Sequence, residues 1–349
     1  MWRKPQVWLG VLVSLVALFL AFRGIEWNLV GKALSNAQYL WLIPSALVLL
    51  AAIWVRGVRW QWLFGEYRDR LPRSRYVSAT AIGYLVTNTL PLRLGEVARM
   101  FFIARDGKQT YALAVSTIVV EHVLDVLVVL GLLLVMLITG GLPVPEDVKH
   151  GAVIGAVLFG GAFVAMLIMV WQRRRVSRWA EWIISRIPRL TTTKWLNVIE
   201  HLLDGFAVLQ PGKPLFVVLF WSVVGWLLSA LSFHFCLLAF IPQASISYSL
   251  FATVASTFVL LLPATPGAIG TLDAAIRESL VVFGIDYNIA LSFAIVFHVM
   301  EIVVMDVVGV ICLLREAGSW AKAKESLRTV TSQIQAPPET GATIPGEEA

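Results

Sequence analysis

Two clusters of acidic and histidine side chains interrupt otherwise apolar stretches of this sequence. The first contains Glu121, His122 and Asp125, and the second contains His298 and Glu301. Residues three or four positions apart share one face of a helix, so the members of each cluster can contact one another. An ionisable group at the centre of a bilayer costs at least about 2.5 kcal/mol, and such groups therefore face a partner or a cavity. The clusters are candidates for chemistry inside a membrane.

Three kinds of chemistry fit these side chains, and the sequence leaves all three open. The acids can pair with Arg93 or Arg99 and hold neighbouring segments in place. They can couple transport to a proton or another cation, since chains of acids and histidines are typical of pumps. They can also bind a divalent metal, although no ligand spacing here is diagnostic. We expect neither a metal nor a cofactor.

Each cluster follows an apolar segment that ends in a break rich in proline and glycine. The first break runs from Asn88 to Glu96 and the second from Leu262 to Gly270. The two breaks are similar at an offset of 172 residues, which relates Tyr76, Pro91 and Gly95 to Tyr248, Pro263 and Gly267. Interrupted hydrophobic segments at matching positions of two halves indicate the binding site of a transporter.

The composition places these segments in a membrane. Of the 349 residues, 58% are hydrophobic and 14% are charged, and the mean hydropathy is +0.78, which excludes an ordinary soluble domain. Six stretches are long enough to cross the hydrocarbon core. They are Val7–Phe22, Tyr39–Phe64, Ala112–Thr139, Gly151–Trp171, Leu215–Ile241 and Tyr287–Leu314. A secretory signal peptide is the alternative for the first, but no Ala-x-Ala cleavage pattern follows it.

Two shorter apolar segments, Tyr76–Leu90 and Tyr248–Leu262, each have only 15 residues. As helices they would reach about 22 Å, which is short of the ~30 Å core. Because arginines lie on both sides of the first segment, we predict that it enters the membrane from the cytoplasm and returns there. The second segment is predicted to enter the membrane from outside. We therefore expect an all-α polytopic membrane protein with about six full transmembrane helices and two re-entrant helical hairpins in an inverted repeat.

The same charge rule predicts a plasma-membrane protein with both termini in the cytoplasm. The transmembrane domain is expected to cover residues 1–316, with a basic cytoplasmic loop at residues 172–213. Residues 317–349 are polar and are expected to form a disordered tail. Residues Glu26–Gln38 resemble a short amphipathic helix on the outer surface.

Arg56 and Arg59 lie near the predicted cytoplasmic end of the second span, close to Trp60 and Trp62. One interpretation is that the arginines extend to the membrane surface beside an interfacial aromatic belt. The other is a phosphate clamp, because the guanidinium fork matches phosphate oxygens.

Four motifs in order resemble the lysylphosphatidylglycerol synthase transmembrane-domain family of flippase-like proteins. They are Arg56-x-x-Arg59-Trp60, Asn88-x-x-Pro91-x-Arg93-x-Gly95-Glu96-x-x-Arg99, Glu121-His122-x-x-Asp125 and Pro266-Gly267-x-x-Gly270. The resemblance covers roughly Leu9 to Leu314. The chain departs from the family pattern at His122, where Arg is frequent, and at Ala268, where a second Gly is frequent.

This resemblance implies that the chain moves a phospholipid or a lipid-linked substrate of the polyprenyl-phosphate type between leaflets. Arg93 and Arg99 would then hold the phosphate, Glu121, Asp125 and Glu301 would gate or couple, and the glycines and prolines would shape the breaks. Membrane lipids and an enzyme of lipid or glycan synthesis are the expected partners, and nucleic acid is not.

Two alternatives remain open: an integral-membrane transferase or its accessory subunit, and a small-solute transporter of the DedA-like kind. Full-length relatives carry a soluble aminoacyl-transferase domain, and this chain ends about 35 residues after its last span. No hydrolase, zinc-protease or P-loop motif is present in the sequence. We therefore expect that the chain is not an enzyme.

The predicted orientation can be tested by cysteine labelling in intact cells. With Cys236 and Cys312 replaced by serine, single cysteines within Arg68–Arg75 should resist an impermeant maleimide, whereas those within Pro242–Ser247 should react. Labelling of both loops from the same side would contradict the inverted repeat.

Overall fold

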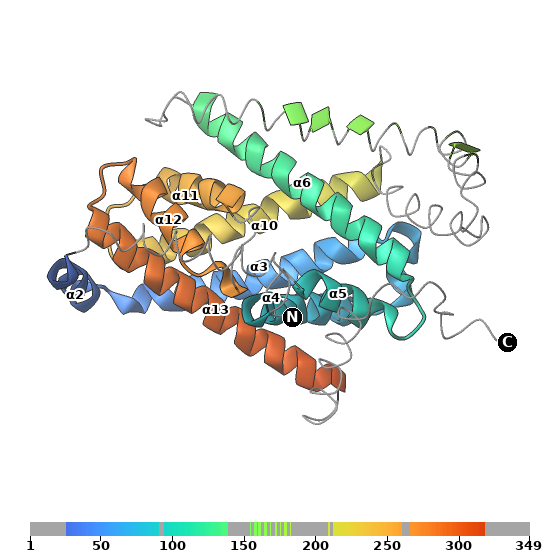
Figure 1. The fold of residues 1–349 in the computed structure, drawn as a ribbon, viewed down its shortest axis with the longest axis horizontal. Helices are drawn as coiled ribbons and strands as arrows, with labels where there is room; N and C mark the ends of the chain where they lie inside the picture. The colour runs from blue at the N-terminus through green and yellow to red at the C-terminus, as the bar shows by residue number, and fades with distance from the viewer. Residues whose placement is uncertain are drawn as a thin grey trace.

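The computed structural model describes residues 26–90, 94–138, 212–259 and 266–317, together with isolated positions between 154 and 182 and residue 209. Every regular element in this part of the chain is a helix, which confirms the all-α fold (Figure 1). The predicted spans at Val7–Phe22 and Gly151–Trp171 lie outside the described residues, apart from isolated helical positions in the second. The loop at 172–213 and the tail at 317–349 lie almost entirely outside them.

The described helices form two groups that are separated in sequence. The first group consists of α2 (Trp27–Asn36), η1 (Tyr39–Trp41), α3 (Leu42–Leu63), η2 (Gly65–Arg70), α4 (Arg73–Thr89), α5 (Gly95–Ala104) and α6 (Tyr111–Ile138). The second group consists of α10 (Lys213–Leu238), α11 (Ile246–Val259), η4 (Pro266–Ala268), α12 (Thr271–Val281) and α13 (Tyr287–Ala317).

Four helical stretches are long and apolar enough to cross a membrane. They are Tyr39–Leu63, Tyr111–Ile138, Lys213–Leu238 and Tyr287–Glu316, and they coincide with four of the six predicted spans. The predicted surface helix at Glu26–Gln38 is present as α2. Both short apolar segments are also helical, as α4 and α11, and α4 ends within the first predicted break.

The two groups repeat one pattern of contacts. In the first, α3 packs on α4, α4 on α5 and α5 on α6; in the second, α10 packs on α11, α11 on α12 and α12 on α13. Between the groups, α6 contacts α10 and α11, while α13 contacts α3 and α4. Each half thus contains a long helix, a broken helical hairpin and a second long helix. The sides of the membrane from which the hairpins enter stay a prediction.

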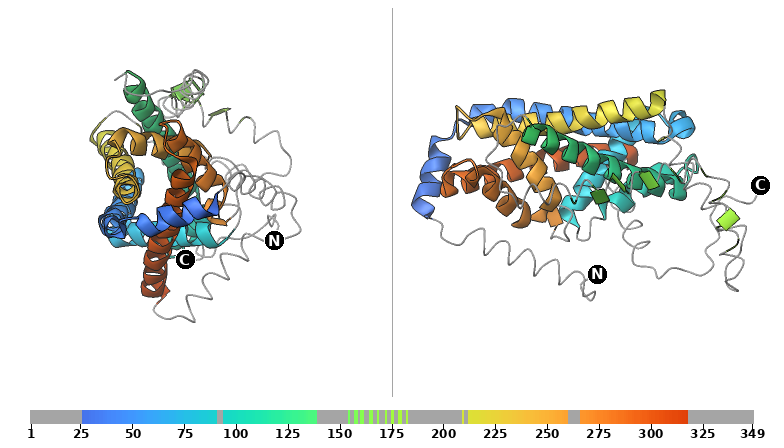
Figure 2. Two further views of the ribbon diagram at one scale, coloured as in Figure 1. Left: turned by 90° about the vertical axis from the view of Figure 1, so that its left-hand side faces the viewer. Right: turned by 90° about the horizontal axis from the view of Figure 1, so that it is seen from above.

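The long helices α3 and α10 run antiparallel along one side of the molecule, where they join the two halves (Figure 2). The Ser45 hydroxyl donates to the Ser232 carbonyl oxygen at 2.7 Å, and the Ser232 hydroxyl donates to the Ser45 carbonyl oxygen at 2.9 Å. Because serine side chains are small, the two backbones can approach closely. Each hydroxyl also finds a hydrogen-bond acceptor on the facing helix, where water is absent.

Each half has its own aromatic core. In the first, the ring of Trp60 meets the edges of Phe64 and Tyr76 at centroid distances of 5.5 and 5.9 Å. In the second, Phe233 lies 4.7 Å from Phe293. These buried rings connect α3 to α4 in the first half and α10 to α13 in the second.

Loops that are predicted to share a side of the membrane lie at the same end of the molecule. At one end, Arg75 pairs with Asp106 and Glu316, and Arg105 also pairs with Glu316, at 3.0 Å. At the other end, the Glu26 amide donates to Asn288 Oδ1 at 3.1 Å. The ion pairs at the first end tie α13 to the start of α4 and the end of α5.

Gly95 permits the close approach of α5 to α4. A Cβ atom added at Gly95 would overlap Thr87 Oγ1 and the carbonyl oxygen of Gly83. A Cβ atom at Gly83 would in turn lie 2.5 Å from Arg99 Cγ. The two glycines therefore make the hairpin tight enough for the Arg99 side chain to pass across α4.

Gly95→Ala should lower the free energy of unfolding by about 1 to 3 kcal/mol, because overpacking forces the hairpin apart. Unfolding in mixed detergent micelles measures the loss. Gly131→Ala in α6 is the matched control, since no atom lies near its added Cβ. Equal stability of the two variants would show that the hairpin contact is wrong.

Candidate functional site

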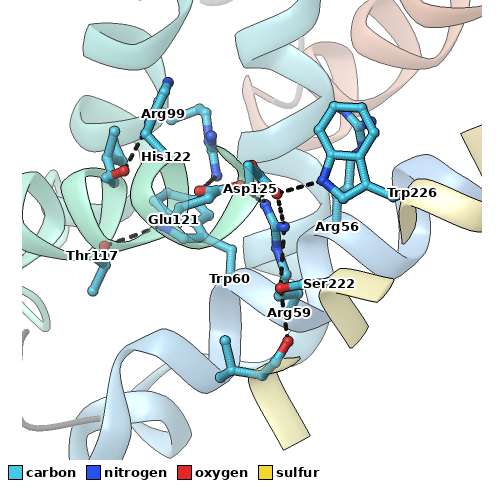
Figure 3. A network of polar contacts seen from close by, with 12 residues as sticks. Arg56, Arg59, Trp60, Arg99, Thr117, Glu121, His122, Asp125, Ser222 and Trp226 are labelled. Carbon is cyan, nitrogen blue, oxygen red and sulfur yellow. Dashed lines mark hydrogen bonds and ion pairs between the residues drawn. The ribbon is translucent and has the colours of Figure 1, made fainter. Parts of the chain in front are cut away.

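A buried network of charges joins α3, α5 and α6 (Figure 3). The guanidinium of Arg59 on α3 donates to Glu121 Oε1 on α6 at 2.6 Å and also pairs with Asp125. The other carboxylate oxygen of Glu121 accepts a bond from Arg99 on α5 at 2.8 Å. One carboxylate thus bridges two arginines that are far apart in the sequence.

Neutral side chains complete this network. Trp226 Nε1 on α10 donates to Asp125 Oδ1 at 2.9 Å. The indole of Trp60 lies beneath the Arg99 guanidinium, 4.2 Å from centroid to Cζ, and its own N–H donates to Thr117 Oγ1 at 3.1 Å. The cation–π contact with Trp60 holds Arg99 in position. The hydrogen bond from Trp226 holds Asp125, the partner of Arg59, and such bonds are stronger in a water-poor interior.

Burial decides how these charges behave. Arg59 is 3% exposed, Arg99 7% and Glu121 6%. Arg59 therefore does not extend to the membrane surface, and that interpretation of this residue was wrong. Glu121 pairs with Arg99, as one of the three possibilities left open by the sequence expects, whereas Asp125 pairs with Arg59. Removal of one partner would leave a buried charge uncompensated, which costs about 3 to 5 kcal/mol in comparable pairs.

Two predicted site residues lie at the margin of this network. Glu96 contacts Arg99 at 3.1 Å from one turn earlier on α5, with a third of its side chain exposed. His122 is exposed, and its Nδ1 lies 2.8 Å from the carbonyl oxygen of Ile118 on its own helix. Although His122 precedes Asp125 by three residues, no hydrogen bond joins them in the described part of the chain.

Arg56 has different surroundings from Arg59, although it lies only one helical turn earlier. It donates to the Tyr84 hydroxyl at 2.9 Å and to Ser229 Oγ at 3.0 Å, and it lies 5.3 Å from the ring of Trp226. Among the described residues, no carboxylate forms an ion pair with it. Arg56 faces a small cavity that is also lined by Glu301.

The second cluster supports the second break. His298 Nδ1 lies 2.9 Å from Asp273 Oδ1, and its Nε2 lies 2.7 Å from the carbonyl oxygen of Gly267. The other Asp273 oxygen accepts the Gly270 amide at 2.9 Å. Gly267 and Gly270 have φ angles of +65° and +85°, which glycine adopts without the strain that a side chain would cause. Pro266 begins the short turn η4, which also contains Gly267.

The two breaks meet in the interior. A Cβ atom on Gly267 would lie 3.7 Å from the carbonyl oxygen of Asn88, and α4 packs against η4. Asn88 also donates from Nδ2 to Asp306 Oδ1 on α13 at 2.9 Å. Pro91 and Arg93 of the first break, and Pro263 of the second, lie outside the described residues. The predicted roles of these three residues stay predictions.

Sequence reasoning missed several polar residues around these centres. They are Tyr84, Ser222, Trp226, Ser229 and Asp273. For Asp273, the signal available was its position three residues after Gly270, which is typical of the acidic residue in an N-terminal capping box. Within the described residues, no group of three or more His, Cys, Asp or Glu side chains is arranged to hold a metal ion.

Comparison with known proteins gives a family-model match at residues 7–309, described as the lysylphosphatidylglycerol synthase TM region. A UPF0104 membrane protein of Methanocaldococcus jannaschii is 22% identical over 62% of this chain and 87% of its own length. A second UPF0104 membrane protein, from Methanothermobacter thermautotrophicus, is 24% identical over 80% of this chain and 84% of its own length. The glycosyltransferase AglD of Haloferax volcanii is 23% identical over 95% of this chain and 56% of its own length. No solved structure matches the chain.

Glu121→Gln should reduce the free energy of unfolding by about 3 to 5 kcal/mol, because two buried guanidinium groups lose their shared carboxylate. Denaturation of the purified protein in detergent micelles measures the change. The matched control is Glu96→Gln, which removes a partly exposed partner of the same Arg99 and should cost less than about 1 kcal/mol. A similar loss in both variants would contradict the central position of Glu121.

Proposed function

We propose that this chain, which belongs to the family of the lysylphosphatidylglycerol synthase TM region, moves a lipid with an anionic headgroup between the two leaflets of a membrane. The observation that supports the proposal most strongly is the meeting of the two breaks, Gly267 beside Asn88, within a bundle that also buries arginines. The acyl tails would stay in the lipid while the headgroup crosses past the breaks.

Broken helices inside a membrane protein need a physical explanation. Backbone that leaves the helical pattern exposes amide and carbonyl groups, and at membrane depth this is tolerated only where protein buries them or water reaches them. In secondary transporters, such breaks supply backbone ligands at the interface of two repeats. The repeated contacts of α3–α6 and α10–α13 support the proposal that both breaks lie at an interface of this kind.

The arginines divide into two groups by their partners. Arg59 and Arg99 are neutralised by Glu121 and Asp125, so their charges hold α3, α5 and α6 together. The described partners of Arg56 are all uncharged, and its guanidinium fork matches the oxygens of a phosphate. We therefore assign headgroup recognition to Arg56 and a structural role to Arg99, in place of the phosphate contact expected for Arg99.

One relative favours a second candidate function. The printed name of the Haloferax volcanii protein, which aligns over 95% of this chain, is that of a glycosyltransferase. The aligned part is 56% of that protein. This chain would then act as a membrane subunit that presents a lipid-linked substrate to a transferase. The two functions share lipid binding, and a covalent product separates them.

Arg56→Ala should slow transport at least about tenfold, because loss of one charge-assisted hydrogen bond to a phosphate is worth about 1.4 kcal/mol or more. The measurement uses purified protein in phosphatidylcholine vesicles that contain fluorescent phosphatidylglycerol, with quenching of the outer leaflet by an impermeant reductant. Arg56→Lys should retain part of the rate, since it keeps the charge but not the fork.

The control for this experiment is Arg68→Ala. Arg68 lies in η2, outside the interior, and pairs with the exposed Asp69 at 3.3 Å. Its replacement should leave the rate within about twofold, because an exposed ion pair of this kind contributes little. The proposal fails if wild-type protein moves no labelled lipid, or if Arg56→Ala is as active as Arg68→Ala. A new labelled product would favour the transferase function.

A further inference from the structure

Glu301 differs from the other acids of the two clusters. Glu121 and Asp125 are held by arginines, and Asp306 accepts a bond from Asn88. Glu301 is half-buried on α13, and within the described part of the chain no hydrogen bond or ion pair engages its carboxylate. An acid in the interior without such a partner can exchange its proton at little structural cost, whereas Glu121 cannot.

Glu301 faces a small cavity at the junction of both halves. The polar lining consists of Arg56 on α3, Tyr84 on α4, Ser229 on α10 and Glu301 itself, and the remaining lining is apolar. A water molecule inside a protein needs two to four polar partners, and these groups provide that number. The cavity thus connects the unpaired carboxylate with the guanidinium that has only uncharged partners.

The other titratable groups near Glu301 are already engaged. On its own helix, His298 is bonded to Asp273 of α12. From α4, the Tyr84 hydroxyl accepts from Arg56. From α10, only Ser229 lines the cavity, and α2 hydrogen-bonds to α13 at Asn288, more than three helical turns before Glu301. When Glu301 gains or loses a proton, Arg56 is therefore the charged group that loses or gains a negative charge beside it.

We infer that Glu301 carries the proton that drives transport, with Arg56 as the group that senses it. Protonation transfers one H⁺ from water to a carboxylate oxygen of Glu301, and deprotonation returns it to water. With Glu301 neutral, Arg56 is free to bind the phosphate of a lipid headgroup. With Glu301 ionised, the carboxylate competes with the phosphate for Arg56 and favours release. The inference rests on the proposed function, and it names a proton as the coupling ion.

The test measures movement of fluorescent phosphatidylglycerol in proteoliposomes with and without an imposed pH gradient. Wild-type protein should move the lipid faster toward one leaflet when a gradient is present, by at least about threefold. Glu301→Gln, which mimics the protonated acid, should still move the lipid but should respond to the gradient by less than about 1.5-fold. Glu66→Gln is the matched control, since it makes the same substitution at an exposed acid in η2, and it should keep the wild-type response.

A second measurement does not depend on the lipid. Infrared difference spectra of the protein between acidic and alkaline pH should show a carboxylic-acid C=O band that is absent in Glu301→Gln and present in Glu66→Gln. If the wild type moves no lipid, the proposed function fails, and the infrared band still reports whether Glu301 exchanges protons. If the wild type moves lipid but neither its gradient response nor the band depends on Glu301, the proton inference is overturned and the proposed function stands.

Discussion

The described structure depends on one buried carboxylate that two arginines share. Glu121 contacts Arg59 and Arg99 on opposite sides of the same carboxyl group, at 2.6 and 2.8 Å. In lipid, apolar side chains gain little by packing against one another, so polar contacts and close backbone approach must hold helices together. The shared carboxylate provides the polar contacts, and Gly83 and Gly95 permit the close backbone approach. Together they fix the hairpin of α4 and α5 against α3 and α6, and this places the end of α4 beside the second break.

The two halves share an architecture but differ in the chemistry that stabilises their hairpins. Ion pairs hold the first hairpin, while the second is held by the hydrogen-bonded chain from His298 through Asp273 to the backbone of Gly267 and Gly270. This difference leaves Arg56 and Glu301 at the junction without an opposite charge directly bonded to either. Structural stability therefore comes from the paired charges. In the proposed mechanism, the junction holds the charges that bind a substrate and exchange a proton.

Sequence alone predicted the features that depend on length and local residue types. Four described spans, the short segments α4 and α11, and the breaks that follow them were predicted from apolar length and from the positions of proline and glycine. Arg59 was not assigned a partner, because Glu121 lies 62 positions away and no local pattern relates α3 to α6. The contact of Arg99 with Glu121 likewise depends on how α5 packs against α6. Asp273 was missed because its role depends on the fold of a break that brings His298 alongside.

Selectivity of lipid movement by the unaltered protein tests the central claim most directly. Initial rates should be compared for fluorescent lipids with anionic, zwitterionic and cationic headgroups and identical acyl chains, in the same phosphatidylcholine vesicles. An arginine at the junction of two broken helices predicts that the anionic lipid moves fastest, by about tenfold over the cationic one. Equal rates for all three headgroups, or rates no greater than in protein-free vesicles, would contradict the account.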